Sequence, residues 1–379
     1  MIPLFKVYVA QNATDKMGNE CHLGEALGDV LASGYIAEGE NVKEFEKYLR
    51  EYLHNKNVLT TNSCTSSLQI ALRLAGVKAG DKVFSSSMTC LATNAPIETL
   101  SATPVWVDVD PIHGMITPDA LISSIKANPY IKVLIYVCWG GDLGPLREVN
   151  GICLEHGIKL IVDAAQAFGT YAHRGILGDG TYGDYICFSF QAIKQITTAD
   201  GGAIAFRNGD DMARANRLKW FGLDRDGFRT TNGEIDWRSD VPEIGFKMHM
   251  NNVAGCIGTA QMKDPGLSAR LSTYIMNDLH LTKALVDVMQ RSWRGPTAAW
   301  VSTFIGDNIP ELLDFLRAKD IHASQMHVNN DVYSGFHADP IELPGVKAFM
   351  EKHISLPCGW WVTDEDVQYM ADCIKGFYE

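Results

Sequence analysis

The hydrophobic pattern is most regular between about residues 57 and 206, where short apolar runs alternate with longer stretches of mixed hydrophobic and polar positions. Short runs rich in aliphatic and β-branched residues predict strands, and the segments between them carry apolar residues at the spacing of helices. The predicted strands span residues 57–61, 82–85, 104–107, 133–137, 159–162, 185–190 and 203–206, and the predicted helices span residues 64–75, 92–100, 118–127 and 146–156. Strands that alternate with helices of this length form βαβ units, so the sequence predicts an α/β domain with a mostly parallel central sheet.

The pattern changes after residue 250. Helices are predicted over residues 251–262, 267–290, 310–319 and 363–377, and strands over 299–305 and 353–356. Thr363 is placed to cap the last helix, whose acidic first turn suits the positive end of the helix dipole. We therefore expect a large α/β domain with an N-terminal segment, residues 1–250, and a smaller α+β domain, residues 251–379. The polar stretch 224–240 is long enough to be a functional loop.

The composition is that of a soluble globular protein. Of 379 residues, 46% are hydrophobic and 21% are charged, which excludes disordered, collagen-like and coiled-coil classes. The net charge of −12 argues against broad binding of nucleic acid or of anionic membranes. No uncharged apolar run approaches the roughly 18–20 residues that a membrane helix needs, and the first residues show no signal-peptide pattern. We expect a soluble, cytoplasmic protein.

The chain has nine cysteines. Their number is odd, no CxxC pair occurs, and most lie within apolar runs, so reduced and mostly buried thiols are a better interpretation than disulfides or a zinc site. The histidines are scattered without the spacing of metal ligands. We predict no metal site.

One short pattern fits a nucleotide-binding fingerprint. Residues 178–183 read GxGxxG, but the fingerprint requires a strand directly before it and a helix that begins at it. Here a predicted strand follows instead of a helix. We interpret the segment as a glycine-rich turn, with dinucleotide binding as the less favoured alternative.

Polar residues follow the ends of two predicted strands. Residues 62–66 join a strand to a helix, so their backbone N–H groups and hydroxyls would face an anion at the positive helix terminus. A plain N-cap by Ser63 or Thr65 is the alternative. Asp163 ends a strand that is otherwise almost wholly apolar, at the edge where α/β proteins bind ligands. A helix cap is again the alternative.

Ser189 and Lys194 follow in an apolar, aromatic setting between two short strands. A lysine there should have a lowered pKa and act as an amine nucleophile; the alternative is a surface lysine that packs only its stem on the protein. Together, the helix terminus, the acid and the lysine match the needs of one cofactor. Pyridoxal 5′-phosphate (PLP) requires a Schiff-base lysine, an acid for its pyridinium nitrogen and a cup for its phosphate.

The chain resembles the DegT–StrS family of nucleotide-sugar aminotransferases, which are PLP enzymes of fold type I, the aspartate-aminotransferase-like fold. The resemblance covers almost the whole chain, and the Asp-Ala-Ala-Gln and Ser-Phe…Lys…Gly-Gly blocks in this order are its most specific part. The segments that carry it are 33–39, 45–46, 61–68, 163–169, 189–194, 201–203, 356–357 and 364–366. The resemblance implies a large domain with a mostly parallel central sheet and a smaller α+β C-terminal domain.

The resemblance also implies a role for each site residue. Lys194 would form the Schiff base and later transfer protons. Asp163 would pair with the pyridinium nitrogen, and Gln166 would contact the ring hydroxyl of the cofactor. The residues that would hold the phosphate are Cys64, Thr65 and Ser189.

Residues 245–252 match the family's segment that reaches into the neighbouring subunit. There Lys247 stands where the family often has asparagine, and it would contribute to the partner's phosphate cup. The resemblance thus implies a homodimer with shared active sites. Two residues depart from the family: Cys90 stands where an aromatic residue usually stacks on the cofactor ring, and Cys64 replaces a common glycine. A thiol gives less stacking area than an aromatic ring, so cofactor affinity or substrate fit could differ.

The implied function is that of a PLP-dependent aminotransferase that converts a keto group of a nucleotide-linked deoxysugar to an amine, with glutamate as the donor. The nucleotide diphosphate would need cations, and candidates near the polar loop are Lys219, Arg225 and Arg229. Three alternatives stay open. They are a PLP-dependent ketosugar dehydratase of the same fold, in which histidine replaces the lysine, a cyclitol or other ketone as acceptor, and a non-catalytic PLP-binding regulator.

Overall fold

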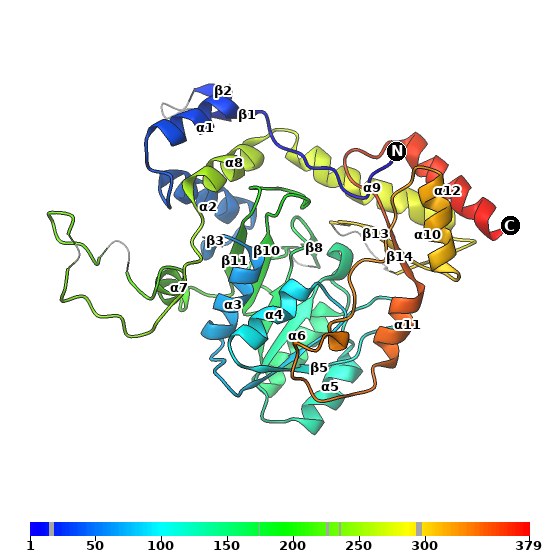
Figure 1. Cartoon of the computed structure of the whole chain (residues 1–379), viewed down its shortest axis with the longest axis horizontal. Helices are drawn as coiled ribbons and strands as arrows, with labels where there is room; N and C mark the ends of the chain where they lie inside the picture. Colours follow the sequence, from blue (N-terminus) through cyan, green and yellow to red (C-terminus); the bar gives the residue numbers. More distant parts are fainter. Residues whose placement is uncertain (15–18, 174, 225–226, 235, 293–297) are drawn as a thin grey trace.

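The computed structural model describes residues 1–14, 19–173, 175–224, 227–234, 236–292 and 298–379. A seven-stranded sheet forms the centre of the large domain, with helices packed around it (Figure 1). Its strand order is β3-β11-β10-β7-β6-β4-β5, and the neighbouring strands from β10 to β5 are all parallel. Strand β11 is antiparallel to both of its neighbours. The predicted α/β domain with a mostly parallel sheet is confirmed.

Both faces of this sheet are buried. Its strands are β3 (Val58–Thr61), β4 (Lys82–Ser85), β5 (Thr103–Trp106), β6 (Val133–Val137), β7 (Lys159–Asp163), β10 (Tyr185–Ser189) and β11 (Gly202–Phe206). The helices of the domain are α3 (Cys64–Leu74), α4 (Leu91–Thr99), α5 (Pro118–Ala127), α6 (Leu146–His156) and α7 (Met212–Leu218). In β7, Leu160 and Val162 join one hydrophobic core while Ile161 joins the other. Burial on both sides explains why these strands read as continuous apolar runs.

The N-terminal segment packs on the first helix after residue 250. It consists of β1 (Asn12–Thr14), β2 (Glu20–His22), α1 (Leu23–Ala32) and α2 (Glu40–Tyr52). Helices α1 and α2 both contact α8 (Asn252–Lys263). Helix α2 buries Val42, Phe45 and Leu49, whose spacing puts them on one face of the helix. The contact is close, because a β-carbon at Gly255 would lie 2.7 Å from the backbone nitrogen of Val42.

The C-terminal part is built around a smaller sheet. Its elements are α9 (Leu267–Leu285), β12 (Gln290–Arg291), β13 (Ser302–Ile305), α10 (Ile309–Ala318), β14 (His353–Leu356) and α12 (Asp364–Tyr378). The three strands pair antiparallel in the order β12-β13-β14, and the helices enclose a core of their own. Thr363 caps α12 as predicted, in a capping box with Asp366. The predicted long helix over 267–290 ends earlier, because residues 290–291 pair as β12.

Packing and backbone pairing both tie the C-terminal part to the rest of the chain. Helix α11 (Pro344–Lys352) packs Val346 and Phe349 into the core of the large domain. At the other end of the chain, Ile2 pairs with Ile321 in a parallel bridge. The C-terminal part is therefore in direct contact with the rest of the chain and is not merely connected to it by a linker.

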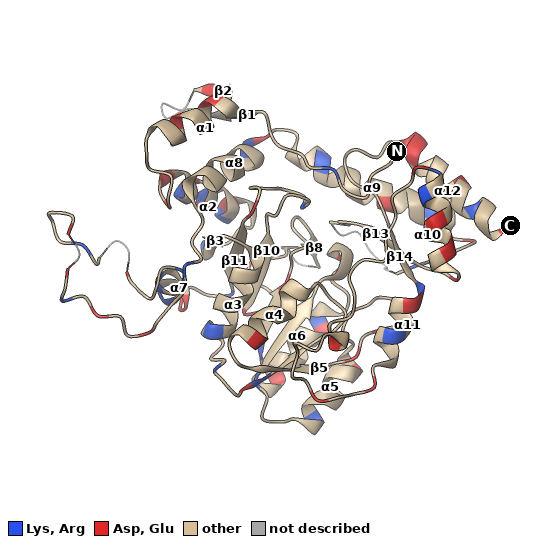
Figure 2. Cartoon of the chain, in the orientation of Figure 1, with Lys and Arg blue, Asp and Glu red and all other residues tan. Residues whose placement is uncertain are grey.

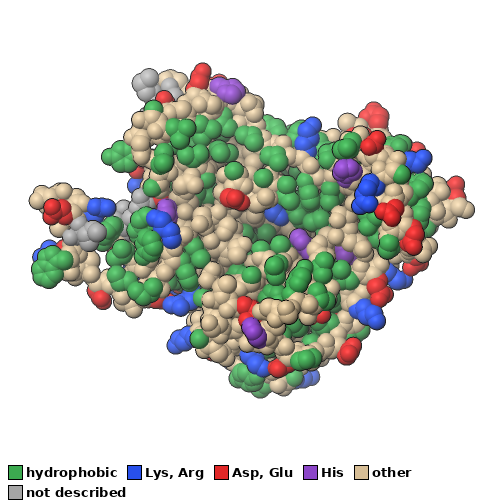
Figure 3. All heavy atoms as spheres, in the orientation of Figure 1, with side chains coloured by type: hydrophobic (Ala, Val, Ile, Leu, Met, Phe, Trp, Pro, Cys, Tyr) green, Lys and Arg blue, Asp and Glu red, His purple; other side chains and the backbone are tan. Residues whose placement is uncertain are grey.

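The loops at the carboxyl ends of the parallel strands meet at one edge of the central sheet, where α/β proteins bind ligands. In the space-filling view the surface is hollowed between the N-terminal helices, the C-terminal part and the large domain, and lysine or arginine and histidine side chains are visible in the hollow (Figure 3). The segment 178–183 lies between β9 (Gly175–Ile176) and β10 and forms a turn, which agrees with its interpretation from the sequence.

Charged residues of both signs are interspersed along the outer helices, and the central strands carry few (Figure 2). All nine cysteines are free thiols, and most are buried. Within the described ranges, none of the helices combines the length and the apolar composition needed to traverse a bilayer.

Candidate functional site

The turn after β3 presents the amino end of α3 to the carboxyl edge of the sheet. Ser63 caps this helix, since its Oγ accepts a hydrogen bond from the Ser66 backbone N–H at 3.1 Å. The backbone N–H groups of Cys64 and Thr65 are the first two of the helix and have no intrahelical acceptor, so they can bind an anion. Gly202 of β11 packs directly on the turn: a β-carbon there would lie 2.5–2.6 Å from backbone atoms of Ser63 and Cys64.

Asp163 ends β7 between two parallel neighbours and is 5% exposed. Its Oδ2 accepts a hydrogen bond from Thr93 Oγ1 at 2.6 Å, and its Oδ1 accepts one from the Ala165 backbone N–H at 3.0 Å. Burial raises the pKa of this carboxyl, while the two hydrogen bonds and the charge of Lys194 oppose the rise. A buried carboxylate with a raised pKa lacks a full counter-charge, so this position suits a cationic group of a ligand.

Lys194 lies in the turn between β10 and β11. Its Nζ is 3.5 Å from the ring centroid of Trp300, whose indole Nε1–H donates to the Ile193 carbonyl oxygen at 2.9 Å. Burial lowers the pKa of Lys194 to about 8, and the charge of Asp163 is the largest opposing influence. An amine with this pKa has a substantial neutral fraction near neutral pH, as a nucleophile requires.

Gln166 lies in the loop after β7 and is 6% exposed. Its Oε1 accepts a hydrogen bond from the Gly140 backbone N–H at 2.6 Å, and its Nε2 lies 3.3 Å from Nε2 of His327. Since the amide nitrogen carries two hydrogens, one N–H remains for a ligand.

Ser189 and two cysteines complete the buried set. Ser189 ends β10 beside β7 and is 6% exposed. Cys64 turns its thiol toward the Cys187 carbonyl oxygen, 3.6 Å away, and burial raises the pKa of this thiol well above its ordinary value. Its contribution to an anion site is therefore its backbone N–H. Cys90 directly precedes α4.

Comparison with known proteins places this chain in a family. Residues 20–375 match the DegT/DnrJ/EryC1/StrS aminotransferase family. The chain belongs to this family. The spore coat polysaccharide biosynthesis protein SpsC of Bacillus subtilis is 24% identical over 375 residues, which cover 93% of each chain.

Two solved structures are similar in fold and sequence. The sugar aminotransferase CalS13 from Micromonospora echinospora superposes with a TM-score of 0.87 at 27% identity, over 99% of this chain and 100% of that one. AtS13 from Actinomadura melliaura superposes with a TM-score of 0.88 at 30% identity, over 99% and 98% of the two chains.

Members of the DegT/StrS family are PLP-dependent aminotransferases, so the chain is a PLP-dependent transaminase of fold type I. The family, fold class, enzyme class and cofactor predicted from the sequence are confirmed. The residues present fit the cofactor, because they include a buried amine of lowered pKa, a buried carboxylate without a full counter-charge and a helix terminus with two N–H groups for a phosphate. The roles of the individual residues stay predictions.

The structure does not support Lys219 as a ligand of a diphosphate. Its side chain is 2% exposed, and its Nζ lies 2.5 Å from Oε1 of Glu38 and 3.9 Å from Oε1 of Glu46. An ammonium enclosed by two carboxylates is already compensated. The sequence could not show this, because both carboxylates are far from Lys219 along the chain.

The other predicted cations lie outside the buried set. Lys247 is exposed and holds its Nζ 3.5 Å from the ring centroid of Trp220 in its own chain. Arg229 is exposed in the loop after α7, where its guanidinium donates to the Gly233 carbonyl oxygen. Arg225 lies outside the described residues.

Three site residues were missed by the sequence interpretation. Thr93 lies in a segment that was noted only for Cys90, and its position one turn into α4 was the signal for a hydroxyl at the edge of the sheet. Trp300 and His327 come from the C-terminal part, and no local pattern marks them. Tertiary folding alone brings these two side chains to Lys194 and Gln166.

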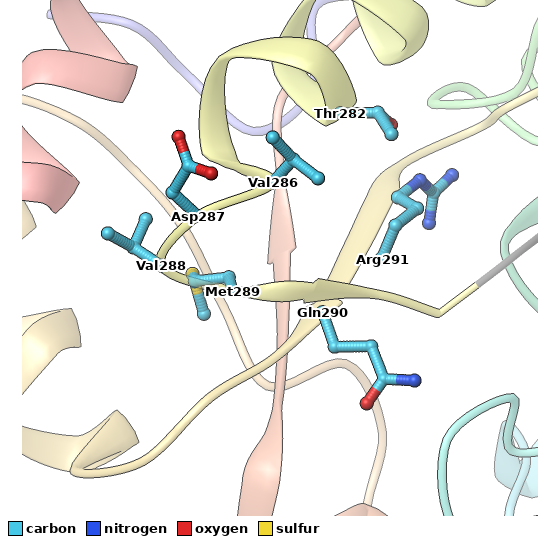
Figure 4. Close-up of a pocket in the computed structure, with 7 residues that line it drawn as sticks. All are labelled: Thr282, Val286, Asp287, Val288, Met289, Gln290 and Arg291. Carbon is cyan, nitrogen blue, oxygen red and sulfur yellow. The ribbon is translucent and has the colours of Figure 1, made fainter.

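A separate cavity of about 390 Å³ lies at the end of α9 (Figure 4). Its lining residues are Thr282, Val286, Asp287, Val288, Met289, Gln290 and Arg291. None of the site residues described above lines it. Arg291, its strongest charge, already donates to Asp278 Oδ1 at 2.5 Å, so the cavity offers no comparable chemistry.

Replacing Thr93 with valine should remove a hydrogen bond that stabilises the ionised carboxylate of Asp163. Valine has a similar shape but no hydroxyl, so a buried hydrogen bond to a charged group is lost, and we expect the apoprotein to lose about 1–3 kcal/mol of unfolding free energy at pH 7. The pKa of Asp163 should rise further because the Thr93 hydrogen bond lowers it. Urea denaturation of the apoprotein measures the first effect, and turnover should fall as well.

Thr89 provides the matched control. Its Oγ1 lies 2.8 Å from Thr93 Oγ1, and it must be the donor because Thr93 uses its own hydrogen for Asp163. Thr89→Val therefore leaves the carboxylate hydrogen bond in place and should cost less stability and less activity. Equal effects of the two valine variants would contradict the role given to Thr93.

Proposed function

We propose that this aminotransferase acts on a keto group of a nucleotide-linked deoxysugar and takes its amino group from glutamate. The observation that carries the proposal is the similarity to CalS13, a sugar aminotransferase, supported by the similarity to SpsC, a polysaccharide biosynthesis protein. The buried amine and carboxylate of the site support it too, because both are groups that amino-group transfer with PLP requires.

When bound, PLP supplies an electron sink for negative charge at the α-carbon of the amino donor. Lys194 would hold the cofactor through its nucleophilic Nζ, and the same Nζ, when free, would remove and return the α-proton of the donor. The carboxylate of Asp163 would pair with the pyridinium nitrogen and keep it protonated. A single lysine thus serves as nucleophile and as acid and base.

The remaining groups bind the cofactor and exclude water. The backbone N–H groups of Cys64 and Thr65 would bind the phosphate, and Ser189, which pairs with Gly202 against the same turn, would add its hydroxyl. Trp300 is 2% exposed and covers the ammonium of Lys194 with its ring. Cys90 would present a thiol to the cofactor ring where the family usually has an aromatic side chain.

Two alternatives from the sequence are less well supported. The dehydratase has histidine in place of the lysine, whereas position 194 is a lysine whose pKa is lowered to about 8. A non-catalytic regulator does not need an amine poised for proton transfer. A cyclitol or another ketone as acceptor belongs to the same transaminase chemistry and is decided by the substrate test.

Incubation with glutamate and a panel of nucleotide-linked ketosugars tests the proposal. We expect one member to yield an aminosugar and an equivalent of 2-oxoglutarate, measured by mass spectrometry. Loss of the nucleotide diphosphate removes charge-assisted contacts, so the free ketosugar should react with a kcat/KM about ten- to a hundredfold lower. Turnover of a cyclitol ketone but of no nucleotide-linked sugar would contradict the proposed acceptor, and an inert Lys194→Ala variant is the control.

We also propose a homodimer in which Lys247 completes the partner's phosphate cup. The backbone N–H of Met248 donates to the Lys219 carbonyl oxygen, and the Asn62 N–H donates to the Met248 carbonyl oxygen, each at 2.9 Å. These bonds fix the segment beside the phosphate loop of its own chain while the Lys247 side chain stays exposed. The long loop before it leaves the body beside α7 (Figure 1). An exposed cation on a fixed segment is suited to reach a second subunit.

Lys247→Ala should weaken cofactor retention about ten- to a hundredfold, since a charge-assisted contact with the phosphate would be lost. Dialysis followed by measurement of the remaining bound PLP gives the ratio. Lys126→Ala removes a comparable exposed charge on α5 and should leave retention unchanged. Unimpaired retention in Lys247→Ala would contradict the role in the partner's site.

Mixing Lys194→Ala with Lys247→Ala, at a PLP concentration too low to load the Lys247→Ala protein, tests the shared geometry. In a dimer of one Lys194→Ala subunit and one Lys247→Ala subunit, one site carries both lesions and the other is intact. With free subunit exchange, about one quarter of the wild-type activity should return. No recovery, despite exchange proven by mass spectrometry, would mean that each site is built from one subunit.

A further inference from the structure

His327 contacts Gln166. The sequence analysis did not identify this residue, and the proposed function gives it no role. It lies in the segment between α10 and α11, and its backbone is left-handed, with φ +63°. This conformation is uncommon for a residue other than glycine and persists only where the surroundings fix it.

Buried hydrogen bonds hold the segment on both sides of this residue. The backbone N–H of the fully buried Asn330 donates to the Ser87 carbonyl oxygen at 2.7 Å, and its side-chain N–H donates to the Thr89 carbonyl oxygen at 2.9 Å. On the other side, the Met326 carbonyl oxygen lies 3.2 Å from Nε2 of the buried His353. The segment is thus anchored to the large domain and to β14, and the imidazole between these anchors has a fixed place.

The hydrogen bonds of Gln166 define the protonation state of the imidazole. The Gly140 N–H donates to Gln166 Oε1, which identifies the oxygen of the amide and leaves its NH₂ facing His327. An amide nitrogen can only donate, so Nε2 of His327 must carry a lone pair and accept. The ring is then neutral, with its proton on Nδ1.

The surroundings of the ring favour the same state. Burial lowers the pKa of His327 to about 4, and the charges of Lys194 and His353 add to this effect. Trp139 packs edge-on against the ring, with 5.6 Å between the centroids. His327 therefore stays a hydrogen-bond acceptor throughout the neutral pH range.

We propose that His327 is a positioning residue of this aminotransferase: its neutral imidazole orients the amide of Gln166, so that the second N–H of that amide is directed at the ring hydroxyl of PLP. The proposal rests on the contact between Gln166 and the cofactor in the proposed function. With Gly140 at the amide oxygen and His327 at one N–H, the amide has a single orientation and one N–H left to give.

The test compares His327→Leu with His327→Gln. Leucine has no acceptor, whereas the Oε1 of glutamine can take the place of the imidazole Nε2 and does not titrate. Neither residue is glycine or β-branched, so both meet a comparable cost in the left-handed backbone. Any difference between the two variants therefore reports the hydrogen bond to Gln166.

The readout is the pH titration of the visible absorbance of the lysine-linked cofactor. A donor to the ring hydroxyl stabilises its anionic form, so the loss of that donor makes the linked cofactor harder to deprotonate. Gln166→Leu should raise the midpoint by about one pH unit. His327→Leu should raise it in the same direction by roughly half as much, because the amide is still present but free to turn. His327→Gln should restore the wild-type midpoint.

The outcomes separate this inference from the proposed function. A visible band that is absent from the wild-type holoprotein, or that persists in Lys194→Ala, contradicts the cofactor assignment itself. A normal band with an unchanged midpoint in His327→Leu overturns the positioning role, and so does a glutamine variant that behaves like the leucine variant.

A second readout needs no cofactor. In the apoprotein at pH 7, ¹⁵N NMR of the histidine side chains should show His327 as the neutral tautomer with its proton on Nδ1. A proton on Nε2 would overturn the inference. This measurement and the glutamine variant keep the test decisive if the leucine variant does not fold.

Discussion

Alanine in place of Lys194 is expected to abolish transamination in a protein that remains folded. The residue is both the nucleophile that links the cofactor and the group that moves the α-proton, and general acid–base catalysis alone is worth about 10²–10⁴ in rate. Because no other amine of the described chain lies beside Asp163 with a lowered pKa, nothing in the site replaces it. Steady-state assays with glutamate and the preferred acceptor measure the loss.

Borohydride reduction of the wild-type holoprotein, followed by peptide mass mapping, should place the cofactor on Lys194. The Lys194→Ala protein should carry no such adduct. A cofactor fixed to another lysine, or residual turnover within tenfold of wild type in the alanine variant, would remove Lys194 from its assigned role.

The lowered pKa of Lys194 makes a further test on the apoprotein possible. With a pKa of about 8, roughly a tenth of the amine is neutral at pH 7, against roughly three parts in ten thousand at the ordinary value of 10.5. The rate of PLP capture by the apoprotein should therefore rise with pH and reach half its maximum near pH 8.

The lowered pKa of Lys194 should also make the stability of the apoprotein depend on pH. Between about pH 8 and 10.5 the unfolded chain holds a proton on Lys194 that the folded chain has released, so the free energy of unfolding of the apoprotein should rise across this window. The Lys194→Ala variant should lack that rise. Urea denaturation at several pH values compares the two proteins.

The central fold could be predicted from the sequence because its signals are local. A strand buried on both faces must be apolar throughout, so the run that ends at Asp163 identified both β7 and the polar residue at its tip. Likewise, Thr363 and the acids after it identified the start of α12.

Several helices were not predicted from the sequence. Helix α2 has Val42, Phe45 and Leu49 at helical spacing, so its sequence does carry a helical pattern, although the sequence analysis did not predict this helix. Helices α7 and α11 have only 7 and 9 residues, too few for a period of 3.6 to stand out. Their positions depend on packing, as Phe349 of α11 in the core of the large domain shows.

The site residues also fall into two groups, those that the sequence identifies and those that only the folded structure reveals. Lys194, Asp163 and Gln166 belong to continuous blocks, and the sequence identifies them. Trp300 and His327 act through contacts that exist only after the C-terminal part has folded onto the large domain. No linear pattern encodes such a contact.

Asparagine in place of Asp163 should reduce turnover by roughly two to four orders of magnitude without unfolding the protein. Asparagine keeps the shape of the side chain: its one amide oxygen can accept the hydrogen bond from the Ala165 N–H, and its NH₂ can donate to the hydroxyl oxygen of Thr93, so the change removes mainly the charge. Without that charge the pyridinium nitrogen loses its proton, and the ring no longer accepts electron density from the α-carbon. Asp163→Glu, which keeps a carboxylate, is the control and should retain more activity.

The stability of the apoprotein gives a second readout of the Asp163 carboxylate, and turnover distinguishes its electrostatic role from a helix cap. Because the pKa of Asp163 is raised in the folded state, the folded chain binds more protons than the unfolded chain above about pH 3.8, and the residue's contribution to stability falls as the pH rises from there through the folded-state value. Asp163→Asn should remove that penalty, so at pH 7 the variant should unfold at an equal or higher urea concentration than the wild type. A cap would behave differently: asparagine caps as well as aspartate, and turnover near the wild-type level would then show that the carboxylate has no part in the chemistry.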